Sequence, residues 1–154
     1  MTINKRDMIA RWFTIVWEDR NLAELDSFLA PSVQEDDMLI GELAPRRDIP
    51  LLVEVFYTLL GATKVDMHQF MEDGDWACVS YTVRTTNADQ VTPIAVNGMM
   101  MVRFEQGLIA EIISRLDCLS MFEQLGQMPP DTLAACFSGH SLTWKSKDPR
   151  QLPG

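Results

Sequence analysis

Basic residues are scarce in this 154-residue chain: 13 Lys and Arg stand against 22 Asp and Glu, which leaves a formal net charge of −9. A chain with this charge repels the phosphates of nucleic acids and of anionic membranes. Long hydrophobic runs are also missing, since none approaches the length of about 20 residues that crosses a membrane. The amino terminus has no apolar core followed by a small-residue cleavage site. We therefore expect a cytoplasmic protein that binds neither nucleic acid nor membranes.

Cysteine and histidine are few, and their positions form no known catalytic or metal-binding pattern. Cys78, Cys118 and Cys136 are odd in number and contain no C-x-x-C pair, so neither a disulfide framework nor a zinc site is indicated. His68 and His140 are isolated, as surface or hydrogen-bonded histidines commonly are. The sequence also lacks a nucleophile elbow, a phosphate-binding loop and a dinucleotide fingerprint. We expect no metal site.

The composition that remains is that of a soluble globular protein, with 47% apolar and 23% charged residues. The length is sufficient for one domain with a real core and too short for two ordinary domains. After Gly126 the content of Pro, Ser, Lys and Thr rises. We therefore predict a domain over residues 1–127 and a C-terminal extension over 128–154, with a short helix from Asp131 to Phe137.

Three helices are predicted in the first 61 residues from apolar spacing and capping residues. Asn4 with Asp7 can cap a first helix to about Asp19. Asn21 can cap a second that stops before Pro31, and Asp48 can cap a third that ends near Gly61. The acidic segment 33–40 is strand-like.

From Thr63 onward the apolar period changes from helical to alternating, and turn-forming residues separate four segments. The predicted strands cover 64–70, 76–86, 94–104 and 108–116. Helices followed by an antiparallel meander indicate an α+β fold: a cone-shaped α+β barrel in which three N-terminal helices pack on a strongly curved, mostly antiparallel sheet. The inside of such a cone can form an apolar ligand pocket.

Strict alternation in the last strand separates its residues into two chemically different faces. One face would carry Ile109, Glu111, Ile113, Arg115 and Asp117. Glu111 is best interpreted as one member of a cross-strand ion pair. If this face lines a pocket, the Arg115 guanidinium could hold Asp117 or orient an anionic group of a substrate.

A second set of side chains is predicted to bound the pocket from the helices and the sheet. Core packing alone explains most of them, although tyrosine hydroxyls could donate hydrogen bonds to a carbonyl group. Together with the last strand, the predicted substrate-binding residues are Trp17, Phe13, Phe56, Tyr57, Tyr81, Met99, Met101, Ile113 and Arg115.

The order of these elements, the Gly-Asp turn in "GDWACVSYTV" and the ending "VNGMMMVRFEQGLIAEIISRLDCLSMFEQLG" resemble the nuclear-transport-factor-2-like superfamily, in particular its SnoaL-like polyketide cyclase branch. The resemblance covers about Ile3 to Gln127. It implies a cone-shaped domain, frequent homodimers through the outer sheet surface, and an acid at Asp117 that projects into the cone. In that branch this acid can act as general base in aldol cyclisation of a polyketide, without metal or organic cofactor.

Several positions depart from the patterns of these relatives. Ile112 and Ile113 stand where His and Trp are common, and Arg115 stands at a usually apolar position. Phe13 and Met100 match the oxyanion donors of ketosteroid isomerases, and neither can donate such a hydrogen bond. The Arg-x-Asp of the epoxide hydrolases is incomplete, because Arg84 is followed by two threonines.

Two interpretations of Asp117 therefore stand side by side. It can be a pocket-facing base, or it can cap the helix that begins directly after it. The first leads to a cofactor-independent cyclase or isomerase that acts on an apolar carbonyl compound. The second suits a ligand-binding or dimeric interaction module without catalysis. The acidic residues Glu35 to Asp37 could add a second acid to the pocket, or they could form a solvated strand edge.

Overall fold

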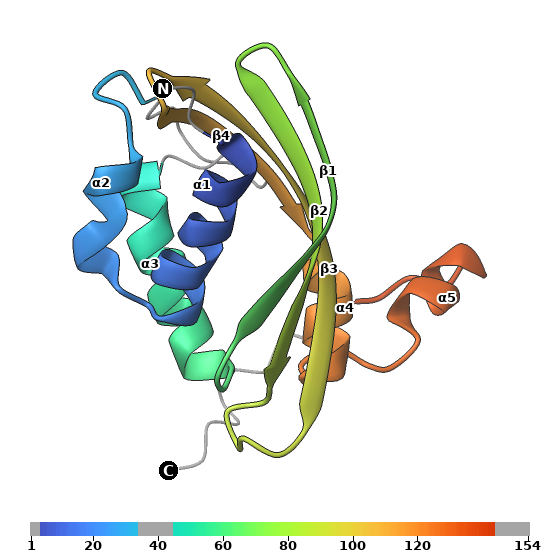
Figure 1. Cartoon of the computed structure of the whole chain (residues 1–154). Coiled ribbons are helices and arrows are strands. Elements are labelled where there is room, and N and C mark those ends of the chain that lie inside the picture. The colour runs from blue at the N-terminus through green and yellow to red at the C-terminus, as the bar shows by residue number, and fades with distance from the viewer. Residues whose placement is uncertain (1–3, 34–44, 144–154) are drawn as a thin grey trace.

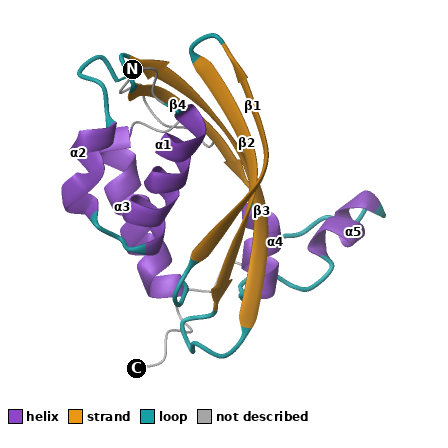
Figure 2. Ribbon diagram, viewed as in Figure 1, coloured by secondary structure: helices purple, strands orange, loops and turns teal. Residues whose placement is uncertain are grey.

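The computed structural model describes residues 4–33 and 45–143 of the chain. Helices cover one face of a curved four-stranded sheet, and a last short helix projects from the other side (Figures 1 and 2). The prediction of an α+β fold with three N-terminal helical segments on a curved antiparallel sheet is confirmed.

The first helical segment begins where its cap was predicted. Asn4 accepts a hydrogen bond from the Asp7 amide at 3.2 Å, and α1 follows over Lys5–Trp12. The winding then widens into the π-helical segment η1, Phe13–Glu18, whose last turn is closed by the Asp19 amide donating to Thr14 O at 2.8 Å.

The next two segments differ from the prediction in how they start. A 3₁₀ turn, η2 (Leu22–Glu24), leads into α2 (Leu25–Phe28), and the Asn21 side chain does not cap it. Helix α3 covers Pro45–Leu59, so Asp48 lies inside the helix as a buried residue bound to Arg47. The expected cap at Asp48 is therefore wrong. Proline fits the first turn of a helix, where an amide would lack an intrahelical partner, and Pro45 occupies that place.

The sheet is an antiparallel meander in the order β1-β2-β3-β4, as predicted. Its strands are β1 (Lys64–Asp73), β2 (Trp76–Thr86), β3 (Pro93–Glu105) and β4 (Leu108–Leu116). Of the strand-like segment 33–40, only Val33 lies within the described residues.

A β-bulge interrupts the pairing of β3 with β4. Arg103 pairs with Glu111 but Phe104 pairs with Ile109, so Ala110 is the extra residue of β4. Strict alternation along β4 was therefore wrong. Ile109 is buried in the core, whereas Glu111, two positions later, shares the outer face with Arg103.

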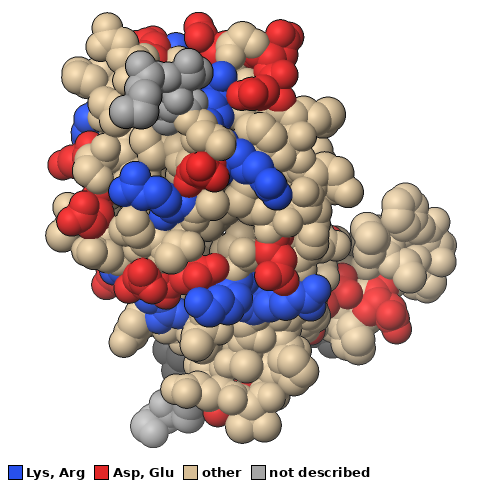
Figure 3. Space-filling model, viewed as in Figure 1, with Lys and Arg blue, Asp and Glu red and all other residues tan. Residues whose placement is uncertain are grey.

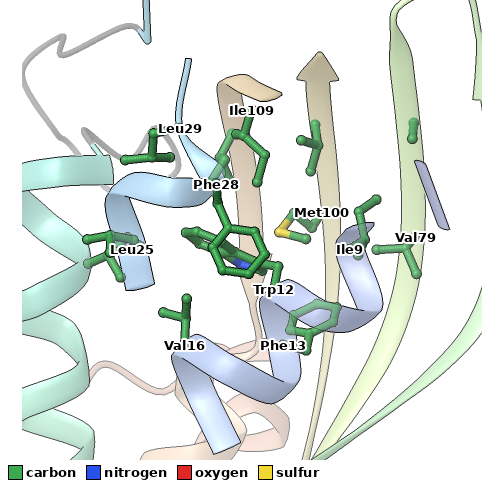
Figure 4. Close-up of a cluster of buried hydrophobic side chains, with 14 of the residues drawn as sticks. Ile9, Trp12, Phe13, Val16, Leu25, Phe28, Leu29, Val79, Met100 and Ile109 are labelled. Carbon is green, nitrogen blue, oxygen red and sulfur yellow. The ribbon is translucent and has the colours of Figure 1, made fainter. Parts of the chain in front are cut away.

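The core fills the space between the helices and the concave face of the sheet. In Figure 4, Trp12 and Phe28 meet in the centre, with rings in an edge-on arrangement at 5.6 Å between centroids. Strand residues whose side chains point to the concave face, such as Val79 and Met100, pack against this helical layer.

Two short helices follow the sheet. Helix α4 (Cys118–Gln124) buries Met121 in a smaller apolar cluster with Leu60 and the start of β3. Helix α5 (Thr132–Phe137) projects away from the sheet on the side opposite the N-terminal helices (Figure 1). The short helix expected in the extension is thus present.

Candidate functional site

A cavity of about 270 Å³ lies between the helices and the concave face of the sheet. Its described lining is predominantly apolar and comes from η1, α3, all four strands and α4. Ligand pockets commonly have this character, with few polar groups in an apolar wall, although most are somewhat larger. Of the nine predicted binding residues, those that line the cavity are Phe13, Trp17, Phe56, Tyr81 and Arg115.

Tyr81 supplies a buried hydroxyl group to this cavity. Its ring packs on Phe13 with 4.8 Å between centroids and crosses Gly98 on the neighbouring strand. The hydroxyl lies 3.4 Å from the Ser114 Oγ, which is long for a hydrogen bond between two hydroxyl groups. Burial raises the pKa of Tyr81 above its ordinary value, so the group stays a neutral hydrogen-bond donor at physiological pH.

Arg20 introduces a positive charge at the cavity wall. Its Nη2 donates to the Gly61 carbonyl at 2.9 Å, and its guanidinium carbon lies 4.4 Å from the centroid of the Tyr57 ring. Tyr57, which was predicted to line the cavity, is instead 64% exposed and supports Arg20. The sequence offered no signal for Arg20, because the position depends on how the end of η1 meets the end of α3.

Cys118 borders the cavity at the start of α4. Burial, with a smaller contribution from the negative charge of Asp117, raises the pKa of its thiol. A thiol of this kind stays protonated near neutral pH and is a poor nucleophile. No catalytic use of Cys118 follows from this geometry.

Asp117 does not line the cavity. Its carboxylate Oδ1 accepts a hydrogen bond from the Ser120 amide at 3.0 Å, which is the geometry of an N-cap for α4. The side chain borders a shallow groove on the other side of the sheet, together with His68, Asn97 and Met99. The helix cap, one of the two interpretations of Asp117, is present in the structure. The other interpretation, a catalytic base, remains a prediction.

Three further predicted residues, Met99, Met101 and Ile113, lie outside the cavity. Met101 pairs with Ile113 and Met99 pairs with Arg115, all with the parity of the outer face. For Ile113 the physical reason is the bulge at Ala110, which gives the inward face of β4 to Ile112 and Ser114. Met99 and Met101 face outward because β3 alternates regularly with Met100 on its buried face. Arg115, at the end of β4, borders both the cavity and the outer groove. Ser114 is a lining residue that strict alternation along β4 had placed on the opposite face, and Met100 of β3 is a second lining residue that was not predicted.

Other candidate groups are separate from the cavity. Glu111 accepts from Arg103 Nε at 3.1 Å, which confirms the predicted cross-strand ion pair. His68 bonds Thr82 Oγ1 at 2.7 Å on the outer side, and exposed His140 contacts the Ala135 carbonyl. Glu35 to Asp37 lie outside the described residues.

Over 4–33 and 45–143, no three His, Cys, Asp or Glu side chains gather in a way that could hold a metal ion. Within those same residues, no helix is both long enough and apolar enough to cross a membrane. On the face seen in Figure 3, Lys and Arg side chains are interspersed with Asp and Glu.

The fold is shared with several solved structures of low sequence identity. TsrD from Streptomyces laurentii has a TM-score of 0.66 at 13% identity, over 82% of this chain and 100% of that protein. A protein named as a polyketide cyclase from Bacillus cereus has a TM-score of 0.68 at 14% identity, over 82% and 87%. A protein with a ketosteroid isomerase-like fold from Catenulispora acidiphila, in complex with trimethylamine, has a TM-score of 0.64 at 18% identity, over 80% and 95%.

At such identities these likenesses establish the fold alone. No curated protein sequence matches the chain. The SnoaL-like domain family, however, matches residues 9–112, from the first helix into the fourth strand. The resemblance inferred from the sequence is thereby confirmed, and this chain belongs to the SnoaL-like domain family.

Proposed function

We propose that this protein binds a small apolar molecule with a carbonyl group in the cavity between its helices and its sheet. The observation that carries the proposal is the buried Tyr81 hydroxyl in a predominantly apolar space of about 270 Å³. Apolar walls favour transfer of a hydrophobic ligand from water, and a single polar group fixes its orientation.

The Tyr81 hydroxyl is suited to donate to a carbonyl oxygen. Its contact with Ser114 at 3.4 Å is longer than the usual 2.5–3.0 Å, so a ligand oxygen can provide a better partner. Its raised pKa keeps the donor proton in place. A buried hydroxyl that gains such a bond stabilises the complex by about 0.5–1.5 kcal/mol.

Cyclisation or isomerisation of the bound molecule would also require a base. Among the described residues that line the cavity there is no carboxylate and no histidine. Asp117, the base implied by the resemblance, accepts from the Ser120 amide instead. We therefore propose ligand binding as the function of the cavity. Catalysis with Asp117 as general base is a separate hypothesis, which can be tested once a substrate is identified.

Binding can be tested with 2-acetylnaphthalene, a neutral apolar ketone, by titration calorimetry and by the fluorescence of Trp12 and Trp17, which line the cavity. Y81F removes the donor and should weaken binding about 2- to 12-fold. Y57F is the matched control, because Tyr57 lies outside the cavity and should retain the full affinity. No binding by the unsubstituted protein, or equal effects of the two substitutions, would contradict the proposal.

A second candidate function, a dimeric interaction module, is favoured by the outer face of the sheet. Met71, Cys78, Met101 and Ile113 pair in sequence across all four strands and form one apolar row. Met71 is 63% exposed and Met101 is 42% exposed. Cys78 and Ile113 are half-buried beside them, and apolar side chains that are exposed together in this way can mark a protein interface.

In this second candidate function, the apolar row on the outer face of the sheet binds another copy of the chain. Sedimentation velocity over a range of protein concentrations should show a dimer for the unsubstituted protein. M101K should shift it to monomer, because a charge in the middle of the row would lose its water on association. A monomer at every concentration would remove this candidate.

A further inference from the structure

We infer that the cavity is built for ligands that carry a carboxylate or a similar planar anion, which the Arg20 guanidinium binds at the cavity wall. This inference deepens the proposed function and rests on it: the apolar body occupies the cavity, and the anionic group meets Arg20. It assigns a role to the charge of Arg20, which its contacts with Gly61 and Tyr57 do not neutralise.

The side chain of Arg20 is held in place before any ligand arrives. Its backbone has a φ of +56°, a left-handed conformation that is unfavourable for residues with a Cβ, and this reverses the chain directly after η1. The Tyr57 ring supports one side of the guanidinium plane, and the Gly61 carbonyl accepts from Nη2. These two contacts restrain the position of the guanidinium group.

The charge of Arg20 has no acidic partner among residues 4–33 and 45–143: no Asp or Glu in those ranges lies within 4.0 Å of its nitrogens. Several other cations on the surface do have such partners, for example Arg84 with Asp66 and Lys64 with Glu18. A partly buried cation beside apolar walls gains free energy from an anion, because water solvates it less there.

The remaining N–H donors of the Arg20 guanidinium determine which class of ligand it can bind. A guanidinium has five N–H donors in a planar fork, and Gly61 uses one of them. A carboxylate matches this fork with two parallel hydrogen bonds, whereas a ketone offers one neutral acceptor. Trp17 and Phe56, which line the cavity beside Arg20, supply the surface for a flat apolar body.

A rival explanation is that Arg20 only ties the end of η1 to the end of α3. That role predicts a loss of stability when Arg20 is replaced, with no change in the preference among ligands. Ligand preference therefore separates the two explanations, and stability alone does not.

The experiment compares 2-naphthoate with 2-acetylnaphthalene, which have the same ring system and nearly the same shape but differ in charge. The unsubstituted protein should bind the acid about 10- to 100-fold more tightly than the ketone, as expected for hydrogen bonds between charged groups. R20M should abolish this preference, and R20K should restore part of it. R11M is the matched control, because Arg11 also lies over an aromatic ring, that of Phe28, but away from the cavity.

The outcomes distinguish this inference from the proposed function. If the ketone binds and the acid binds no better, the inference is overturned while the proposed function stands. If neither compound binds, the proposed function fails and the inference fails with it. If R20M lowers stability but leaves the preference for the acid intact, Arg20 is a structural tie and the inference is wrong.

Discussion

The substitution G98A tests whether the Tyr81 ring needs a residue without a side chain on the neighbouring strand. Gly98 and Tyr81 are a directly opposed pair on β3 and β2, and the tyrosine ring crosses over the glycine toward Ser114. A Cβ at position 98 would lie 2.5 Å from Tyr81 Cζ and 2.6 Å from its hydroxyl oxygen. Real Cβ atoms essentially never come so close to another heavy atom, so in G98A the ring must move.

Two opposing effects set the size of the change. Overpacking a core position costs about 1–3 kcal/mol, whereas alanine is favoured over glycine in a strand interior by roughly 0.5–1 kcal/mol. The free energy of unfolding of G98A should therefore fall by about 1 kcal/mol, within a range of roughly 0–2.5 kcal/mol. Because the displaced ring also loses its place against Phe13 and inside the cavity, the affinity for 2-acetylnaphthalene should fall together with stability.

A double-mutant cycle attributes the effect to the tyrosine ring. In the background of Y81V the ring is absent, so G98A should become neutral or stabilising by up to about 1 kcal/mol. Urea unfolding of all four proteins, with sucrose present to keep the weakest one folded, gives the coupling energy. If G98A destabilises both backgrounds equally, the close contact with Tyr81 is not the cause and the reasoning is refuted.

Two further predictions concern Asp117 and the titration of Tyr81. D117A should lower the free energy of unfolding by about 1 kcal/mol through loss of the α4 cap, whereas D117N should be nearly neutral because asparagine caps equally well. If an identified substrate is turned over, loss of turnover in D117N with intact folding would establish the base, and unchanged turnover would exclude it. For Tyr81, burial raises the pKa above 10.0, the value in the unfolded chain. The stability that this hydroxyl contributes is complete below pH 10 and is lost as pH rises toward the folded pKa. Urea midpoints from about pH 8 to pH 11 should therefore fall more steeply for the unsubstituted protein than for Y81F, and parallel curves would contradict the raised pKa.

Local patterns were sufficient to predict most of the elements. The helix cap at Asn4 is a contact within three residues, and the four strands were predicted from local alternation and turn residues; the cap and the strands are present. The starts of α2 and α3 could not be predicted in the same way. Asn21 and Asp48 are both good capping residues, but packing of the helices on the sheet placed one outside a cap geometry and buried the other inside α3.

The candidate site shows the same division. Phe13, Trp17, Phe56 and Tyr81 could be named from their residue type and position on predicted elements, and they do line the cavity. Met101 and Ile113 were assigned to the cavity, yet they face outward. For Ile113, one extra residue at the bulge inverts the faces of β4, and no pattern of single residues reveals where that bulge occurs. Met101 faces outward because β3 buries its neighbour Met100.

The sequence by itself determined the class of this protein: an acidic α+β chain of the SnoaL-like domain family, with helices followed by an antiparallel meander. Only the tertiary structure decided which polar groups reach the cavity. It turned Asp117 to the first turn of α4, placed Tyr81 across Gly98, and brought Arg20 to Gly61, which lies 41 residues away in the chain. The physical reason is that residue type sets what a side chain can bind, whereas strand register and helix packing set what it can reach.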